Sequence, residues 1–162
     1  VASISVYLPT FMSSEGASLV IAGSALSIYE LAGVAGALTS GTLSDRLGRR
    51  FILVSAALSS SLILLVFLNV HGLAQAAALL ALGFANLSTT PVLLAIVQEN
   101  LPNHRAVGNG LFMAITFLVQ LLTILAVGLM GDAVGLRSAF FWSAFISLLS
   151  IPAILALPVA QP

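Results

Sequence analysis

Glu30 is the side chain of this 162-residue sequence best placed to do chemistry, because only 6% of the residues are charged and Glu30 lies well inside an apolar stretch. It precedes Gly41 by eleven residues, or about 16 Å of helix. A carboxylate in hydrocarbon is costly, so it should face a water-filled cavity or a bonding partner. Glu30 could therefore bind a proton or a cation near the membrane midplane. Alternatively, a protonated Glu30 could bond to a neighbouring helix and only steady the fold.

Two rows of mostly uncharged polar residues occur at helical spacing. The longer row comprises Asn109, Met113, Thr116, Gln120 and Thr123, at intervals of four, three, four and three residues. The shorter row comprises Gly83, Asn86 and Thr90. Residues with these spacings share one face of a helix. Two such faces at membrane depth can line an aqueous cavity, or they can bond helix to helix at about 0.6 kcal/mol per bond.

The densest group of charges lies in the ten residues from Gly41 to Arg50, which we call the signature segment. It holds four of the ten charged side chains, and long apolar stretches lie on both sides of it. Charged groups are expensive in hydrocarbon, so this segment indicates a turn at a membrane surface. Its three arginines indicate the cytoplasmic side, where loops carry an excess of Arg and Lys.

The signature segment resembles the signature loop of the major facilitator superfamily, a large class of secondary transporters. In that family a Gly-x-x-x-Asp-Arg-x-Gly-Arg-Arg pattern links two membrane helices on the cytoplasmic face. Every fixed position is present here, namely Gly41, Asp45, Arg46, Gly48, Arg49 and Arg50. The resemblance extends over nearly the whole chain.

The resemblance implies a gating role for this segment. In the family, the signature Asp (here Asp45) meets the positive end of a neighbouring helix, and the basic residues pair with acidic groups, so that one access state is held closed. Gly48 should supply a turn with positive φ, and Gly41 should permit close packing. Glu99 could pair with Arg105 or with a signature arginine. The arginines could also serve topology alone.

The resemblance also bears on the polar rows, because the family's second-half counterparts of spans one, two, four and five border the substrate path. We therefore expect the rows to line a cavity. The expected substrate- and ion-binding residues are Glu30, Asn86, Thr90, Thr116 and Gln120. None of them indicates a particular substrate.

Composition excludes most other classes of protein. The chain is 60% hydrophobic, with a mean hydropathy of +1.17 and no net charge, whereas about 25% of residues are charged in soluble domains. We expect an integral, multi-pass membrane protein with lipid as its surroundings and no nucleic-acid partner. No nucleophile with a nearby base and no phosphate loop appears, so neither an enzyme nor a cofactor is expected. His71 and His104 fall in turns without a second ligand at metal spacing, which favours solvated residues over a metal site.

The expected elements are six membrane spans. They cover residues 1–12 (the outer part of a first span whose beginning is missing), 17–40, 51–68, 73–97, 107–130 and 139–157. Gly33, Ala37 and Gly41 should form a small-residue face on the second span, and Pro91 should break the fourth. Residues 41–50 and 98–106 are the expected cytoplasmic loops. This alternation places four of the five arginines inside and only Arg137 outside.

The sequence contains a weaker second copy of the signature segment. Gly41, Asp45, Gly48 and Arg50 correspond to Gly128, Asp132, Gly135 and Arg137, at an offset of 87 residues. Three spans separate the two copies, so the second should lie at the opposite face of the membrane. This arrangement indicates an inverted three-plus-three repeat with a binding site near the midplane.

Together these features predict an all-α six-helix bundle that forms one half of a twelve-helix transporter. The intact signature is commonest in the family's first half, whereas residues 98–157 and the uncharged end of the chain resemble the second. We favour the second half, so the other six helices would be its partner. The expected function is alternating-access transport in a bacterial inner membrane, as proton-coupled efflux (antiport) of drugs or metabolites. Uptake symport, uniport, and a non-transporting sensor or assembly protein are the alternatives.

Overall fold

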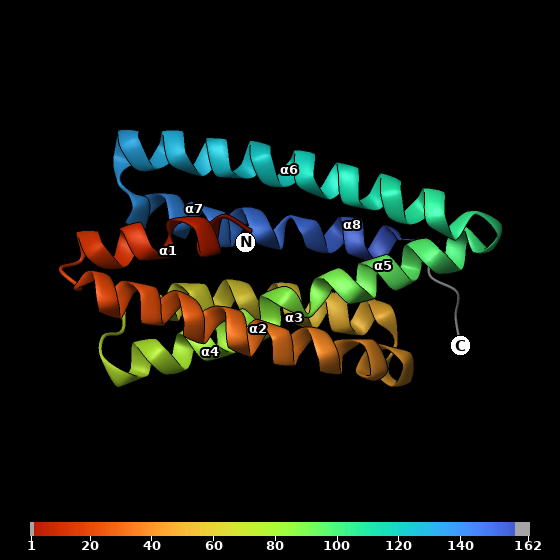
Figure 1. Ribbon diagram of the computed structural model, residues 1–162, viewed down its shortest axis with the longest axis horizontal. Helices are drawn as coiled ribbons and strands as arrows, with labels where there is room; N and C mark the ends of the chain where they lie inside the picture. The colour runs from red at the N-terminus through yellow and green to blue at the C-terminus, as the bar shows by residue number, and fades with distance from the viewer. Residues whose placement is uncertain (1, 158–162) are drawn as a thin grey trace.

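The computed structural model describes residues 2–157, with side chains from residue 4 onward, and these residues fold into helices joined by short turns (Figure 1). The elements are α1 (Ala2–Ser14), α2 (Leu19–Leu47), α3 (Arg49–Phe67), α4 (Leu73–Leu87), α5 (Thr89–Asn100), the 3-10 helix η1 (Pro102–His104), α6 (Arg105–Val134), α7 (Leu136–Leu148) and α8 (Ser150–Ala156). The predicted all-α architecture is confirmed.

The helices run roughly antiparallel, and their turns alternate between the two ends of the bundle (Figure 1). One end holds Gly48 and the turn around η1, and we call it the signature end. The other end, which we call the distal end, holds the turns at residues 15–18, 68–72 and 135. The signature segment and its weaker copy therefore lie at opposite ends, as expected for an inverted repeat.

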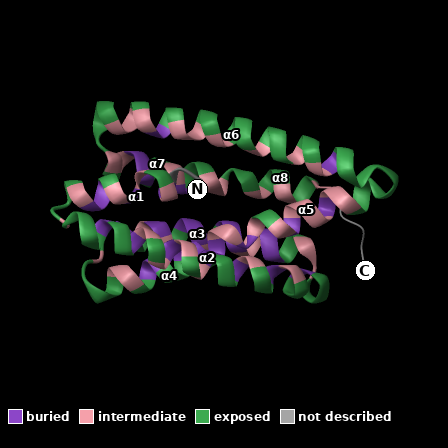
Figure 2. Cartoon of the chain, in the orientation of Figure 1, coloured by how far each residue is buried: buried purple, intermediate pink, exposed green. Residues whose placement is uncertain are grey.

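Apolar side chains cover much of the outside of the bundle. Within residues 2–157, five helical stretches are long and apolar enough to cross a membrane: Leu19–Leu47, Arg49–Phe67, Leu73–Asn100, Pro102–Val134 and Leu136–Ala156. The stretch that includes α6 is the least covered by the rest of the chain, since only 6% of its most apolar window is buried (Figure 2). Exposed side chains such as Phe117 and Leu121 need lipid or protein around them.

The interior joins α1, α2, α3, α4 and α7. Its largest fully buried side chains include Tyr29, Phe67 and Phe140. Phe11 lies between two rings, with centroid distances of 5.8 Å to Phe67 and 5.3 Å to Phe140. These aromatic contacts connect α1 to α3 and α7, so the two three-helix repeats share one core near the distal end.

Close packing of α2 against α4 depends on two glycines. A Cβ at Gly36 would collide with the backbone carbonyl of Phe84, and a Cβ at Gly83 would collide with that of Tyr29. The predicted face of Gly33, Ala37 and Gly41 is wrong in register. Gly33 and Gly36 are buried, whereas a Cβ at Gly41 would meet no atom within 4 Å in the described part of the chain. The row that packs follows intervals of three and four, as helix geometry requires, instead of strict intervals of four.

The predicted ten-residue loop at 41–50 is not a loop. Residues 41–47 continue α2, Arg49 begins α3, and Gly48 alone joins them with φ +90°. The positive φ predicted for Gly48 is therefore confirmed. The expected loop at 98–106 is also mostly helical, since only Leu101 lies outside α5, η1 and α6. Charges mark the membrane surface, but a helix can extend past that surface into water.

The break predicted near Pro91 separates α4 from α5 at Ser88. The Ser88 hydroxyl donates to the carbonyl of Phe84, and the Thr89 hydroxyl donates to that of Asn86 at 2.8 Å. Side-chain hydroxyls therefore bond to two carbonyls of this turn, but neither is the carbonyl of Leu87, which is the one that loses its backbone donor because of Pro91. A second break, at Leu149, separates α7 from α8.

Candidate functional site

Arg49 is the centre of a polar network at the signature end. Its Nε donates to both carboxylate oxygens of Glu99, at 3.0 and 2.9 Å, and its Nη2 donates to Oε1. Only 15% of the Arg49 side chain is exposed, compared with 39% for Glu99. A bidentate pair with little exposure is stronger and more directional than an ordinary surface ion pair. It joins the start of α3 to the end of α5.

Asp45 and Ser44 complete this network from α2. Asp45 lies 3.1 Å from Arg49 Nη2, but 62% of its side chain is exposed, so solvent weakens the attraction. The buried Ser44 hydroxyl accepts from Arg49 Nη1 at 3.4 Å and donates to the Gly41 carbonyl at 2.8 Å. Of the two partners suggested for Glu99, the structure selects a signature arginine. Arg46 is exposed and has no ion-pair partner within residues 2–157.

The two copies of the signature share a detailed geometry. Gly48 and Gly135 adopt nearly the same conformation, with φ, ψ of 90°, 137° and 86°, 148°, and each ends a long helix. Two residues later, Arg50 donates to the carbonyl of Leu157 just past α8, and Arg137 donates to the carbonyl of Leu68 just past α3. Each arginine therefore caps the end of a helix that belongs to the other repeat.

Glu30 lies in the middle part of α2, between its buried and exposed faces. It follows the buried Tyr29 and makes no hydrogen bond or ion pair within the part of the chain that the structure describes. An unpaired, half-buried carboxylate in a membrane span is available to a proton, a cation or a partner outside this chain.

Asn86 and Thr90, both predicted to bind substrate, have different surroundings. The Asn86 amide donates to the Tyr29 hydroxyl at 3.0 Å, which joins α4 to α2. This bond is of the helix-to-helix kind, and it leaves the amide oxygen of Asn86 as an acceptor. Thr90 is exposed and makes no side-chain hydrogen bond to any described residue.

The polar row of α6 is half-buried except at Met113, which is exposed. The Thr116 hydroxyl donates to the carbonyl of Phe112 at 2.7 Å, so its oxygen remains an acceptor. Gln120 is half-buried and has no hydrogen-bond partner among residues 4–157. At the signature end of the row, Gln98 of α5 donates to Asn109 at 3.2 Å. α6 packs against α1, α5 and α7, and this bond joins its polar row to α5.

Two tyrosines belong to these polar contacts, and sequence periodicity missed both. Tyr29 accepts from Asn86, and Tyr7 donates to the Ile124 carbonyl at 3.0 Å, which joins α1 to α6. A tyrosine hydroxyl inside an apolar span needs a partner, so tyrosines at membrane depth are a usable signal. His71 and His104 are exposed in turns at opposite ends of the bundle, so they cannot share a ligand.

Comparison with known proteins identifies the class. The family model of the Major Facilitator Superfamily matches residues 1–162, so the chain belongs to this family of membrane transporters, and the resemblance of the signature segment is confirmed. The chain is therefore part of an integral, multi-pass membrane protein.

A curated relative matches most of the chain. It is the protein named "Uncharacterized MFS-type transporter YfnC" of Bacillus subtilis (strain 168), 30% identical over 145 residues. The match covers 89% of this chain and 35% of the relative, so the chain spans about a third of that protein's length. No solved structure matches.

Proposed function

We propose that the complete protein moves a small solute across the membrane by alternating access, as proton-coupled efflux of drugs or metabolites. The present chain would supply the second six-helix half, and six further helices would face it. The observation that supports this most directly is Glu30, a carboxylate in mid-span without a partner among the described residues. In a family of transporters, an ionisable group at that depth suits ion coupling.

The proposed binding surface combines Glu30 with Asn86, Thr90, Thr116 and Gln120. Thr90 and Gln120 have no side-chain partner within residues 4–157, and Asn86 and Thr116 keep free acceptor oxygens. The facing half would enclose these groups, as expected when α6 is covered so little by its own chain. A mostly apolar cavity with a few polar groups is typical of small-molecule sites.

The signature end is the proposed cytoplasmic gate. Arg46, Arg49, Arg50 and Arg105 all belong to it, whereas Arg137 is at the distal end, and the positive-inside rule assigns the arginine-rich end to the cytoplasm. The Arg49–Glu99 pair would keep α3 and α5 together, while Arg46 and the exposed Asp45, which lies beside Arg49, would be accessible to the other half. The match to a Bacillus protein supports the bacterial plasma membrane as the proposed location.

Counterflow in proteoliposomes containing the full-length protein tests the proposal. A transporter exchanges internal unlabelled solute for external labelled solute without any driving ion. A sensor or assembly protein does not, so absence of exchange across a panel of amines, sugars and organic acids would contradict transport. An imposed pH gradient then separates the coupled modes: efflux antiport predicts accumulation in inside-acidic, inside-out vesicles, and uniport predicts none.

A further inference from the structure

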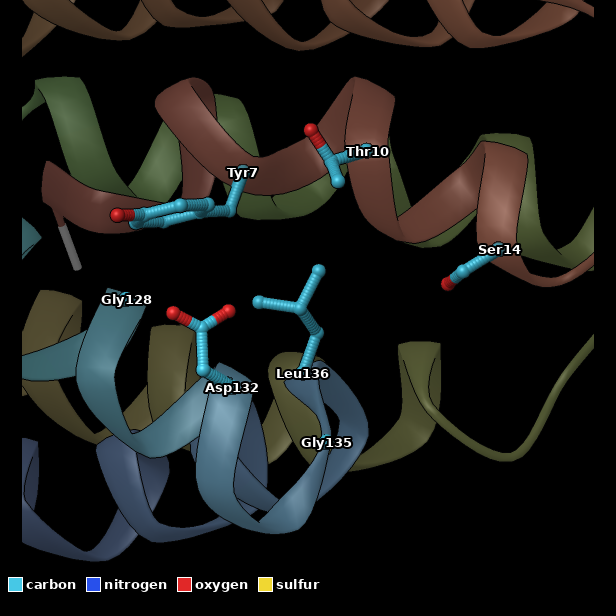
Figure 3. A pocket seen from close by; sticks show the side chains of 8 residues that line it. Tyr7, Thr10, Ser14, Gly128, Asp132, Gly135 and Leu136 are labelled. Carbon is cyan, nitrogen blue, oxygen red and sulfur yellow. The ribbon is translucent and has the colours of Figure 1, made fainter.

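The described part of the chain has a polar concavity that is separate from the groups around Glu30. It lies at the distal end between α1 and the junction of α6 with α7, with a volume of about 450 Å³. Tyr7, Thr10 and Ser14 line it from α1, and Gly128, Asp132 and Leu136 line it from the other side (Figure 3). Volumes of about 300–1,000 Å³ are usual for small-molecule sites.

Asp132 is the charged group of this pocket, and its carboxylate points across the pocket toward α1 (Figure 3). It is the repeat counterpart of Asp45, whose carboxylate pairs with Arg49 four residues later. The position four residues after Asp132 is Leu136, which cannot pair with a carboxylate. Asp132 makes no ion pair or hydrogen bond within residues 2–157, so its charge is left for a ligand.

Two of the three hydroxyls that line the pocket, those of Tyr7 and Ser14, present oxygens and not hydrogens, whereas the Thr10 hydroxyl makes no hydrogen bond to a described residue. Tyr7 uses its hydrogen on the Ile124 carbonyl at 3.0 Å, and Ser14 uses its hydrogen on the Phe11 carbonyl at 2.8 Å. A hydroxyl whose hydrogen is engaged offers only lone pairs to the pocket. The Tyr7 bond depends on Gly128, because a Cβ there would collide with the Tyr7 hydroxyl.

Among the described residues no basic side chain lines the pocket, and its only charged group is a carboxylate, which favours a cation over an anion. Arg137, the arginine of the distal end, is directed elsewhere: it donates to the Leu68 carbonyl and lies 3.7 Å from Glu15. A pocket with one carboxylate, several acceptor oxygens and apolar walls is complementary to a ligand that carries N–H donors and a positive charge.

We propose that this distal pocket binds protonated organic amines, with the ammonium group at the Asp132 carboxylate and the carbon skeleton against Leu136 and the ring of Tyr7. This binding site is distinct from the surface around Glu30. It requires neither proton coupling nor a given direction of transport.

Calorimetric titration of the full-length protein in lipid nanodiscs tests the proposal, with benzylammonium as the probe and benzyl alcohol as its neutral analogue of similar shape. The titration is run in about 150 mM NaCl, so that unspecific attraction to surface charge is screened. We expect benzylammonium to bind and benzyl alcohol to bind at least about tenfold more weakly, because the charge-assisted hydrogen bonds are lost.

Two variants distinguish a specific binding site from diffuse electrostatic attraction to the protein surface. Asp132→Asn keeps the shape of an exposed residue, so folding should be unaffected, and it should weaken benzylammonium binding about tenfold or more. Glu15→Gln removes the same charge from the same end without touching the pocket, and it should leave the affinity within about twofold. Equal losses in both variants, unchanged binding in Asp132→Asn, or equal binding of the two probes would overturn the proposal. Because binding is measured directly, none of these results depends on the transport assay.

Discussion

Glu99 and Glu30 are both carboxylates on membrane helices, but their surroundings suit them to different roles. Glu99 accepts a bidentate bond from Arg49, which holds its carboxylate in one position. Glu30 has no such partner in the described part of the chain. Protonation of Glu30 therefore breaks no observed contact, which is consistent with the proposed role in proton coupling.

Glu30→Gln should abolish proton-coupled flux in the full-length protein. Glutamine keeps the size and hydrogen-bonding ability of protonated glutamate but cannot release a proton. We expect accumulation driven by a pH gradient to fall at least about tenfold, while counterflow of the same labelled solute persists. Both rates are measured in proteoliposomes.

Glu30→Asp provides the matched control, because it keeps the carboxylate and should retain a measurable part of the coupled flux. Full coupling in Glu30→Gln would reject the role of Glu30. Loss of cooperative unfolding in that variant would support the structural interpretation instead, in which Glu30 only steadies the bundle.

The Asn86–Tyr29 bond should contribute to stability. Tyr29→Phe leaves the Asn86 amide without its observed acceptor inside the bundle. A double-mutant cycle with Asn86→Leu should give a coupling of about 0.6 kcal/mol, measured by denaturant unfolding in detergent. A coupling of zero would show that Asn86 finds another partner, and would favour Asn86 as a cavity residue.

For single residues, the sequence predicts the depth of a side chain in the membrane better than it predicts its hydrogen-bond partners. Counting residues from Gly41 places Glu30 in mid-span, and α2 does hold it in its middle part. The same counting gives Asn86 and Thr90 one shared face. It could not foresee that Asn86 would bond to Tyr29, because that contact depends on how closely α2 and α4 approach.

At the scale of elements, the packing of α2 on α4 is sensitive to single methyl groups. Gly36→Ala places a Cβ against the Phe84 carbonyl, which is backbone and cannot move aside cheaply. We expect this variant to lose about 1–3 kcal/mol of stability through overpacking. The measurement is the unfolding midpoint of the purified protein in detergent.

Gly41→Ala is the matched control on the same helix, because its Cβ would meet nothing within 4 Å among the described residues. Alanine is favoured over glycine in a helix by about 1 kcal/mol, so this variant should be neutral or slightly more stable. If Gly41→Ala destabilised the chain as much as Gly36→Ala, the register seen in the structure would be contradicted.

Composition predicted the number and order of the long helices but not their ends. Residues 41–47 carry turn-like polarity, yet they belong to α2, and a single glycine completes the reversal. Polarity reports contact with water, whereas the end of a helix depends on local backbone geometry. In this segment the sequence signal for that geometry was Gly48, with its positive φ.

For the whole molecule, the alternation of turns predicts opposite sidedness for the two histidines. In a cysteine-free version of the complete protein, His71→Cys should react with an impermeant maleimide in intact cells, and His104→Cys should react only after permeabilisation. Both residues are exposed in turns, at the distal and signature ends. Labelling of both from the same side would contradict the inverted plan.

The proposed gate also predicts the result of exchanging the charges of Arg49 and Glu99. Arg49→Glu should bring a carboxylate beside those of Glu99 and Asp45 and slow counterflow by about tenfold or more, because the α3–α5 connection is lost. Exchanging the charges in Arg49→Glu/Glu99→Arg should restore part of the rate, as expected for residues coupled by direct contact. If the exchange restored nothing, the pair would not be what holds this end together.

The caps made by Arg50 and Arg137 constrain how the molecule can deform. Arg50 ties the start of α3 to the chain just past α8, and Arg137 ties the start of α7 to the chain just past α3. These two hydrogen bonds join the antiparallel α3 and α7–α8 at both ends, so they oppose sliding of one helix along the other. Tilting remains possible, and α3 and α7–α8 would then move together as one rigid unit. The little-covered α6 could bend independently of that unit.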